Sequence, residues 1–322
     1  AAMTRLAAAA APDVPVLQAD LAHLPLATGS VGGIWASKAH QHLPAADLPL
    51  ALADLHRTME VGGRLELTVF ATVRGADGGH EPTVEEVSTA ASGDDLPGRL
   101  FTWWHPDHLA TVVEAAGFSV DDVAFRPAST GDPHDLKARA ATAATALPDH
   151  VGAGMRLLCV GLNPSVHAAE AGVGYVTGSN RFWPALAAAG LATRDRDPRH
   201  LLRHDHIGMT DLVKRPTPRA DELSAAEYRE GVTRLDALCA WLRPAAVAVV
   251  GLAGWRAAVD RRATVGWQDA TVGGSPVYVL PSTSGLNART SLADLVAHLR
   301  TAAGGPAGQA SRGPKRSRSQ AP

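Results

Sequence analysis

The sequence is poor in cysteine and contains no long apolar run. Its two cysteines, Cys159 and Cys239, are too few for a multi-disulfide framework, a structural Cys₄ zinc site or an all-cysteine iron–sulfur cluster. The most apolar stretch, residues 245–255, is far shorter than the roughly 20 residues that span a bilayer. We therefore expect no membrane span and a reducing, cytoplasmic setting.

The chain also lacks an excess of charge of either sign. It has 30 Lys and Arg residues against 32 Asp and Glu residues, a balance that neither favours nor excludes nucleic acid, because electrostatic footprints are local. With 46% hydrophobic and 19% charged residues, the composition excludes wholesale disorder. Residues 303–322 are a local exception, predicted as a disordered basic tail that serves either solubility or transient phosphate contacts. The tail carries no acid, and its basic residues are Arg312, Lys315, Arg316 and Arg318.

The length of 322 residues predicts two domains, at roughly 150 residues for each. In residues 1–125, short strand-like runs alternate with helical stretches, which is typical of α/β proteins. Strands are predicted at 14–17, 34–37, 65–70 and 118–125, and helices at 47–59 and 106–116. Residues 126–146 are rich in Ala, Thr, Pro and Asp, and are predicted as an interdomain linker.

A second α/β pattern occupies residues 147–302. Leu157–Val160 is a continuous apolar run, as expected for a strand that is covered on both faces. Further strands are predicted at 246–250 and 277–280, and capping boxes that begin at Ser224 and Ser291 predict two helices. The predicted fold class is therefore α/β with two domains, each a mainly parallel sheet with helices on both faces.

Two loops follow predicted strands of the second domain. Ligands bind at the carboxyl ends of the strands in open parallel sheets, so residues 161–165 and 281–289 are the candidate site. Taken alone, an Asn-Pro after a strand is usually a turn, and a Ser/Thr/Gly run is usually a plain loop. Position favours a site here, but it does not name a reaction.

Four segments in this region resemble the mismatch-specific uracil/thymine-DNA glycosylases. They read GLNPSVHAAEAGVGYVTGSNRFWPAL, GMTDLVKRPT, ELSAAEYREG and PSTSGLNAR. The resemblance covers residues 147–300, with motif order and spacing kept. It implies a uracil-DNA glycosylase-like α/β/α sandwich and a monomeric enzyme that needs no cofactor and no metal. Such an enzyme flips uracil or a related damaged pyrimidine out of mismatched duplex DNA (G·U type) and excises it by hydrolysis, in association with the nucleoid.

The resemblance also implies roles for individual residues. Asn163 matches the asparagine that positions the hydrolytic water, and a neutral carboxamide can orient water although it is a poor general base. The implied mechanism is therefore dissociative, with loop amides that stabilise charge on the departing base. Tyr175 matches an aromatic residue that stacks on the flipped base, with a half-buried core tyrosine as the alternative. Base-binding positions are Gly161, Leu162, Tyr175 and Ser282. Four residues are mainly pocket scaffold: Asn180, Arg181, Phe182 and Trp183.

The second loop resembles a DNA-intercalating segment, with Leu286 as an apolar wedge between Gly285 and the basic Arg289. It departs from the bacterial mismatch enzymes, which commonly have Asn-Pro where Ser282-Thr283 stands here, and Ala288 is an extra residue before the arginine. The loop lacks the histidine of the fast uracil glycosylases, and this absence favours the mismatch-specific branch.

Residues 1–125 resemble the C-terminal two-thirds of a class I S-adenosylmethionine-dependent methyltransferase. The matching segments include VLQADLAHLPL, IWASKAHQHLP and LADLHRTMEVGGRLELTVF. Asp20 matches an acidic residue near the adenine of the cofactor, and a solvated turn is its equal alternative. The family's glycine-rich cofactor loop is not in this chain, which we interpret as an internal start, so S-adenosylmethionine is expected to bind only with a longer N-terminus. Three interpretations stay open: a glycosylase with a truncated methyltransferase-like domain, a bifunctional protein, or a non-catalytic DNA-binding module.

Overall fold

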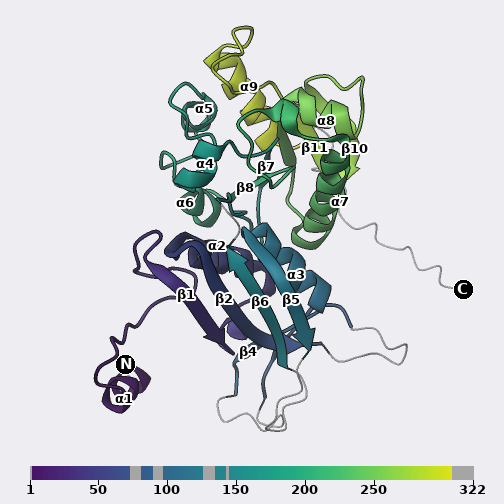
Figure 1. Cartoon of the computed structure of the whole chain (residues 1–322). Coiled ribbons are helices and arrows are strands. Elements are labelled where there is room, and N and C mark those ends of the chain that lie inside the picture. The colour runs from purple at the N-terminus through teal and green to yellow at the C-terminus, as the bar shows by residue number, and fades with distance from the viewer. Residues whose placement is uncertain (1, 73–80, 90–96, 126–134, 143–144, 307–322) are drawn as a thin grey trace, which may run out of the picture. The chain divides into compact units, whose positions relative to one another are not determined.

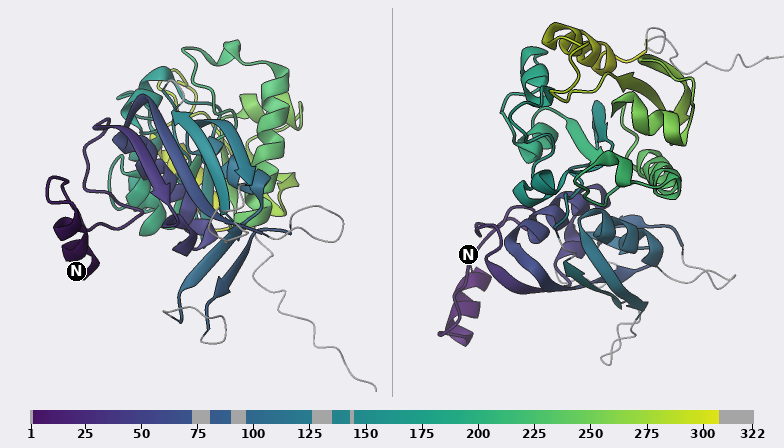
Figure 2. Two further views of the ribbon diagram at one scale, coloured as in Figure 1. Left: turned by 60° about the horizontal axis from the view of Figure 1, so that its bottom comes forward. Right: turned by 45° about the horizontal axis from the view of Figure 1, so that its top comes forward.

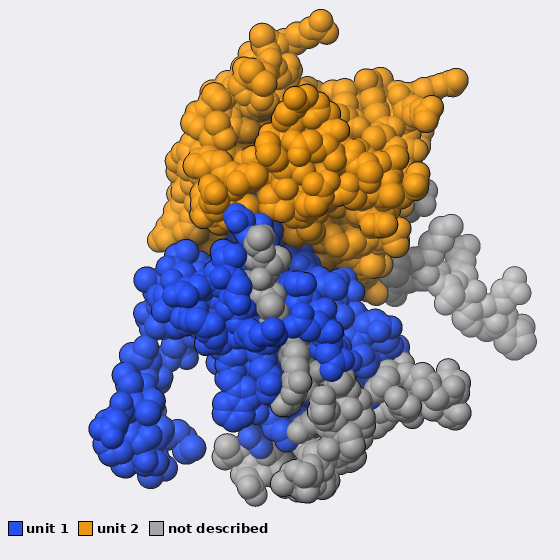
Figure 3. All heavy atoms as spheres, viewed as in Figure 1, with its two compact units in different colours: residues 1–152 blue, residues 153–322 orange. Residues whose placement is uncertain are grey.

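The computed structural model describes residues 2–72, 81–89, 97–125, 135–142 and 145–306 (Figure 1). The chain divides into two compact units, residues 1–152 and residues 153–322, which are coloured separately in Figure 3. Within the residues that the structure describes, each unit contains one sheet, of six strands in the first unit and five in the second. Two α/β domains are therefore confirmed.

The first unit is built on a mixed sheet. Strands β1 and β4 run parallel to β2, whereas β6 lies antiparallel between β2 and β5 (Figure 1). Its helices are α1 (Ala2–Ala10), α2 (Leu48–Thr58) and α3 (Pro106–Ala115). Its strands are β1 (Val31–Ser37), β2 (Met59–Ala71), β3 (Val84–Val87), β4 (Leu100–Trp104), β5 (Phe118–Phe125) and β6 (Asp135–Thr142). The helices predicted at 47–59 and 106–116 and the strands predicted at 34–37, 65–70 and 118–125 are confirmed.

Two predictions for the first unit are wrong. Residues 135–142 lie within the predicted linker but form β6, whose backbone pairs with β2 on one side and β5 on the other. Residues 126–134 and 143–144 of that linker lie outside the described residues. Pairing along both edges overrides a sequence with few strand-favouring residues. Residues 14–17 form no strand, and both Val14 and Leu17 are exposed. The first unit also extends past residue 147, because the Asp149 amide donates to the Ala115 carbonyl at the end of α3.

The second unit is built on a mainly parallel sheet with the order β10-β11-β9-β7-β8. Strands β7, β8, β9 and β11 run parallel, and β10 pairs antiparallel at one edge. The strands are β7 (Leu157–Gly161), β8 (Ile207–Asp211), β9 (Val247–Val250), β10 (Gly266–Val272) and β11 (Ser275–Leu280). The helices are α4 (Val166–Ala171), α5 (Phe182–Ala188), α6 (Pro198–Arg203), α7 (Ala225–Leu242), α8 (Leu252–Ala258) and α9 (Leu292–Ala303).

Strand β7 lies at the centre of the core of the second unit. All five of its residues are buried, because helices cover both faces of the sheet. Helices α5 and α9 lie on one face, and α7 and α8 lie on the other (Figure 1; Figure 2, right). Leu157 and Cys159 pack in one cluster with side chains of α5, α6 and α9. The three strands predicted from apolar runs in this unit are confirmed.

Both predicted capping boxes are present. The Ser224 hydroxyl accepts from the Glu227 amide at the start of α7, and Ser291 and Asp294 make the same exchange at the start of α9. In each box the carboxylate returns a hydrogen bond to the amide of the serine. The predicted tail from residue 307 onward lies outside the described residues, and Ala303 instead ends α9. Among the helices that the structure describes, none is long and apolar enough to cross a membrane.

Candidate functional site

The candidate site lies at the edge of the second sheet where its parallel strands end. Strands β7 and β11 both run parallel to β9, so the residues that follow them emerge at the same edge. Asn163 lies two residues beyond β7, and the segment 282–290, called here the 282–290 loop, follows β11. The topology therefore brings the carboxamide of Asn163 and the exposed Leu286 to one edge of the sheet.

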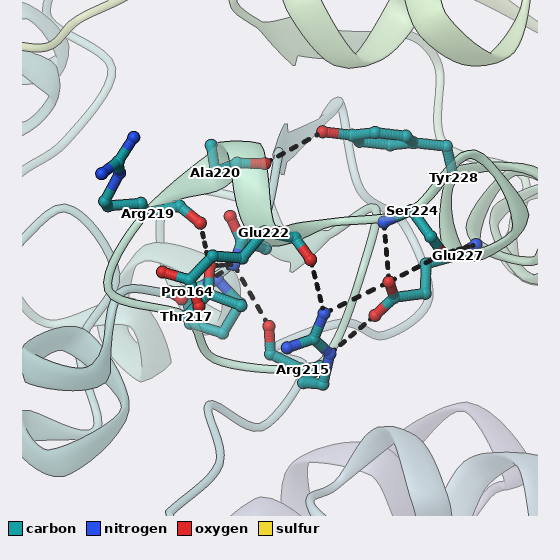
Figure 4. Close-up of polar contacts among 10 residues, drawn as sticks. Pro164, Arg215, Thr217, Arg219, Ala220, Glu222, Ser224, Glu227 and Tyr228 are labelled. Atoms are coloured by element: carbon teal, nitrogen blue, oxygen red, sulfur yellow. Dashed lines mark hydrogen bonds and ion pairs between the residues drawn. The ribbon is translucent and has the colours of Figure 1, made fainter.

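The Asn163 carboxamide is oriented by three acceptors. Its Nδ2 donates to the hydroxyl oxygen of Thr217 at 2.7 Å and to the carbonyl oxygens of Pro164 and Arg215, each at 3.2 Å. The Thr217 hydroxyl donates its own proton to the Arg219 carbonyl at 2.8 Å, so it can only accept from Asn163 (Figure 4). This network assigns which end of the carboxamide is nitrogen. Oδ1 of Asn163 accepts no hydrogen bond from the described residues, and it is left to accept one from water or substrate.

The segment that contains Arg215 and Thr217, whose oxygens accept hydrogen bonds from Asn163, is itself hydrogen-bonded to the start of α7. The Arg215 guanidinium donates to the Glu227 carboxylate at 2.7 Å and to the Glu222 carbonyl at 3.1 Å (Figure 4). The hydrogen bond from Arg215, followed by those from Ser224, lowers the pKa of Glu227 to about 2. Glu227 thus caps α7 and also holds the residue whose carbonyl accepts from Asn163.

Gly161, the last residue of β7, is surrounded by polar groups. A Cβ at this position would overlap Oδ1 of Asp211 and would lie 2.9 Å from the Tyr175 hydroxyl oxygen. Asp211 is its partner at the end of β8, and both residues are buried. Burial, and then the Asp211 carboxylate, raise the pKa of Tyr175 well above its ordinary value. The phenol therefore stays protonated, and its buried hydroxyl has no hydrogen-bond partner among the described residues.

Tyr175 lies against the core through one face of its ring. The ring stacks on Phe182, with centroids 4.0 Å apart and planes at 22°, and Phe182 itself is fully buried. Tyr175 has a left-handed backbone with φ of 57°, and the adjoining loop is fixed by the Trp183 indole, which donates to the Gly174 carbonyl at 2.9 Å. Asn180 accepts from the Phe182 amide at 3.0 Å and shapes the start of α5. One face of the Tyr175 ring is therefore covered by Phe182.

Leu162 and Ser282, the other two predicted base-binding residues, differ in their surroundings and in their exposure to solvent. A Cβ on Gly254 would lie 2.5 Å from Cδ1 of Leu162, so the Leu162 side chain packs on α8. Ser282 is exposed, and its hydroxyl accepts from the Ser284 amide at 3.3 Å. Ser282 is therefore the more exposed of the two residues.

The 282–290 loop presents Leu286 to solvent. The Leu286 side chain is 96% exposed. Next to it, a Cβ on Gly285 would lie 2.8 Å from both the Cβ and the carbonyl oxygen of Ser179, so only glycine fits this close approach. Arg289 is exposed, and its amide donates to the Asn287 side chain at 3.3 Å. Leu286, the candidate wedge, is thus an exposed apolar side chain on a loop that packs closely against Ser179.

Three contributors to the site had no role assigned from sequence. Thr217 and the Arg215 carbonyl receive the Asn163 carboxamide, and Asp211 lies beside Gly161. Arg181, which the sequence placed in the scaffold, hydrogen-bonds to the 282–290 loop. The motif GMTDLVKRPT contains three of these residues, but their proximity depends on the pairing of β8 with β7.

The candidates of the first unit do not form a comparable cluster. Asp20 is exposed, and its carboxylate accepts from the Ala22 amide at 2.9 Å, as in a solvated turn. His42 bonds to the Leu100 carbonyl through Nδ1 at 2.9 Å, and burial lowers the pKa of His40 to about 4. Asp20 thus lies as expected for its alternative, a solvated turn, and the expectation that S-adenosylmethionine binds only with a longer N-terminus stays a prediction. No group of three His, Cys, Asp or Glu residues in the described part of the chain could hold a metal ion.

Family models match both units. Residues 148–302 match the model of the uracil DNA glycosylase superfamily, and residues 1–67 match that of a methyltransferase domain. Residues 148–302 are thus similar to the uracil DNA glycosylase superfamily, and residues 1–67 are similar to a methyltransferase domain. The first similarity supports a DNA glycosylase function in general, that of a hydrolase of N-glycosidic bonds.

Solved structures resemble the N-terminal part of the chain. One is 1,6-didemethyltoxoflavin-N1-methyltransferase from Burkholderia thailandensis, with 19% identity and a TM-score of 0.36 over 44% of this chain and 56% of that protein. S-adenosylmethionine-dependent methyltransferases from Methanosarcina mazei and Mesorhizobium loti share 14% and 15% identity, each with a TM-score of 0.34. Both cover 44% of this chain, and 77% and 76% of those proteins. The chain thus spans little more than half the length of the first of these proteins.

Proposed function

We propose that residues 153–306 form a DNA glycosylase that removes uracil or a related damaged pyrimidine from mispaired duplex DNA of the G·U type. The observation that carries this proposal is the orientation of Asn163. Three acceptors occupy its Nδ2, so Oδ1 is directed away from them and is available to accept a hydrogen bond from water. The partner would be double-stranded DNA bound by a monomer, in the cytoplasm and close to the nucleoid.

Asn163 positions water in this mechanism rather than deprotonating it. A carboxamide is not a base at neutral pH, so the glycosidic bond must break largely before water adds. The N-glycosidic bond lengthens toward an oxocarbenium ion, and the departing pyrimidine takes the electron pair of that bond. Water then adds to the sugar carbon, with its orientation fixed by Oδ1 of Asn163. The water proton that is lost leaves with the base or with solvent.

The residues around Gly161 would bind the flipped base. Gly161 allows Asp211 and the Tyr175 hydroxyl to approach the end of β7 closely, and the Tyr175 ring face that is not stacked on Phe182 would stack on the base. The protonated Tyr175 hydroxyl is a donor without a partner among the described residues. Leu286 would fill the space that the extruded nucleotide leaves in the duplex.

A single-turnover excision assay tests this function. Purified protein is incubated with a labelled duplex that holds one G·U pair, and abasic sites are revealed by alkali. We expect cleavage by the wild type and a loss of at least ~100-fold in Asn163→Ala, because the water loses its orienting group. Gln268→Ala is the matched control, since this carboxamide lies in β10 and also donates to backbone carbonyls.

The substrate panel tests the mismatch preference. It includes uracil, thymine and an etheno-adduct opposite guanine, uracil opposite adenine, and uracil in single-stranded DNA. Preference for the mispaired duplexes supports the proposal. If the wild type excises none of these bases, the glycosylase function is refuted; equal rates for wild type and Asn163→Ala would remove Asn163 from the mechanism.

A further inference from the structure

One residue connects the start of α5 to the 282–290 loop through four hydrogen bonds. The backbone amide of Arg181 donates to the Thr283 carbonyl at 2.9 Å. Its guanidinium donates to the Ser284 carbonyl at 3.0 Å, to the Asn287 carbonyl at 2.8 Å and, in a short contact, to the Thr290 carbonyl. These acceptors lie on both sides of Leu286, so the loop closes around the guanidinium.

Arg181 is itself fixed to the core. The next residue, Phe182, begins α5 and is fully buried beneath the Tyr175 ring. On the other side, Ser179 contacts Gly285 so closely that a Cβ there would meet its backbone at 2.8 Å. The segment 179–182 is therefore a platform on which the loop rests.

The chemistry of the contact requires an arginine. The guanidinium is planar, always charged and carries five N–H donors in a fixed fork, so it can bond several carbonyls at once. A lysine ammonium is a compact point charge at the end of a flexible chain, and it cannot satisfy three separated carbonyls in the same geometry. Binding of these backbone carbonyls therefore depends on the planar shape of the guanidinium as well as on its charge.

The benefit of this arrangement is preorganisation. A single exposed leucine is ordinary on a protein surface and needs no explanation by itself. Leu286 is 96% exposed, and the loop is bonded to Arg181 at residues before and after this leucine. Such a loop is already ordered, so it does not have to become ordered when DNA binds. Ordering a free loop would reduce the affinity for DNA by the conformational entropy lost.

We propose that Arg181 is a positioning residue that keeps the 282–290 loop in its protruding shape, so that Leu286 can enter a duplex without prior rearrangement. This inference rests on the proposed glycosylase function. It assigns no contact between Arg181 and the reacting atoms. Its consequence is that loss of Arg181 impairs excision from duplex DNA and spares excision from single-stranded DNA, where no gap must be filled.

The test compares Arg181→Lys, Leu286→Ala and the double variant on G·U duplex and on single-stranded uracil DNA. We expect Arg181→Lys to lower the second-order rate constant for duplex excision about tenfold, through weaker binding, with less than about a twofold change on single strands. The double variant is expected to match Leu286→Ala alone, because two changes that disable one wedge are not additive. Arg300→Lys is the control, since Arg300 donates to the Ala188 and Ala189 carbonyls at the opposite end of α5.

Equal losses on both substrates, or losses that multiply in the double variant, would overturn the proposal. If Arg181→Lys fails to fold, Asn287→Ala serves instead, because the Asn287 side chain donates only within the loop, to Ser282 and Thr290. This variant is expected to show the same duplex-selective loss. Amide hydrogen exchange gives a readout that does not depend on activity. Exchange in residues 282–290 should quicken in Arg181→Lys and not in Arg300→Lys, and unchanged exchange would refute the positioning role even if the wild type excises no base.

Discussion

The two loops at the candidate site are held by different kinds of contact. The loop after β7 continues the pairing of its strand, since the carbonyls of Gly161, Leu162 and Pro164 accept from amides of the chain that follows β8. Among the described residues, the 282–290 loop makes no such ladder to the sheet, and Arg181 bonds to it through its backbone amide and its guanidinium. The first loop is therefore bonded to the sheet by its backbone, whereas the second is bonded to the core mainly through one residue, Arg181.

This difference suits the two tasks of the proposed function. The water molecule must lie within a fraction of an ångström of the position from which it can add to the sugar carbon, and backbone pairing can give the residues that orient it that accuracy. A wedge must tolerate different neighbouring bases, so a loop fixed at its base and exposed at its tip is sufficient. The contrast predicts that damage to the first loop lowers activity on every substrate, and that damage to the second lowers it on duplexes alone.

The largest effect is expected from Gly161→Ala. The new Cβ would overlap the Asp211 carboxylate inside the sheet, where neither strand can move away. Overpacking of this kind costs about 1–3 kcal/mol of stability, and the displaced Asn163 should lose excision on duplex and single strand alike. Thermal unfolding measures the loss of stability, and the excision assay measures the loss of activity on each substrate. Gly178→Ala is the control because a Cβ there meets nothing within 4 Å, and a normally active Gly161→Ala would show that the first loop is not rigid.

A smaller effect is expected from Gly285→Ala. Its Cβ would press on Ser179, which lies on the protein surface, so the 282–290 loop can shift outward as a unit. We expect duplex excision to fall about tenfold, with single-stranded excision and the melting temperature nearly unchanged. A comparable fall on single strands would show that the two loops do not divide the work as described.

The smallest effect is expected from Glu227→Gln. Glutamine retains the capping geometry but loses the ion pair with Arg215, an exposed contact, so excision should fall no more than about twofold on both substrates. The pKa of Glu227 is lowered to about 2 in the folded protein, from 4.5. Its stabilisation is therefore complete above pH 4.5 and is lost as the pH falls toward 2. The difference in melting temperature between wild type and variant should shrink over that interval, and a difference that stays constant would contradict the ion pair.

Several elements could be predicted from the sequence because their causes are local. Leu157–Val160 is a strand since four consecutive apolar residues need cover on both faces, and β7 has it. Ser224 and Ser291 begin helices since their hydroxyls meet amides three residues along the chain. The position of Asn163 shortly after a buried strand could also be predicted, because the apolar run that marks the strand is local.

Other features could not be predicted because their causes lie far away in the chain. Strand β6 exists only because β2 and β5 pair with both of its edges. Asn163 is oriented by Thr217 and Arg215, which the pairing of β7 with β8 brings within reach. The stacking of Tyr175 on Phe182 depends on the buried core cluster that holds Phe182 in place.

The sequence by itself determined the identity of the chemistry: a carboxamide after one strand, a leucine on a later loop, and the order in which strands and helices alternate. The tertiary structure alone decided which atom of Asn163 faces outward and which arginine supports Leu286. The physical reason is that hydrogen bonds between neighbours in the chain follow from local backbone geometry. A contact such as that of Arg181 with Ser284, 103 residues apart, exists only after the sheet has assembled.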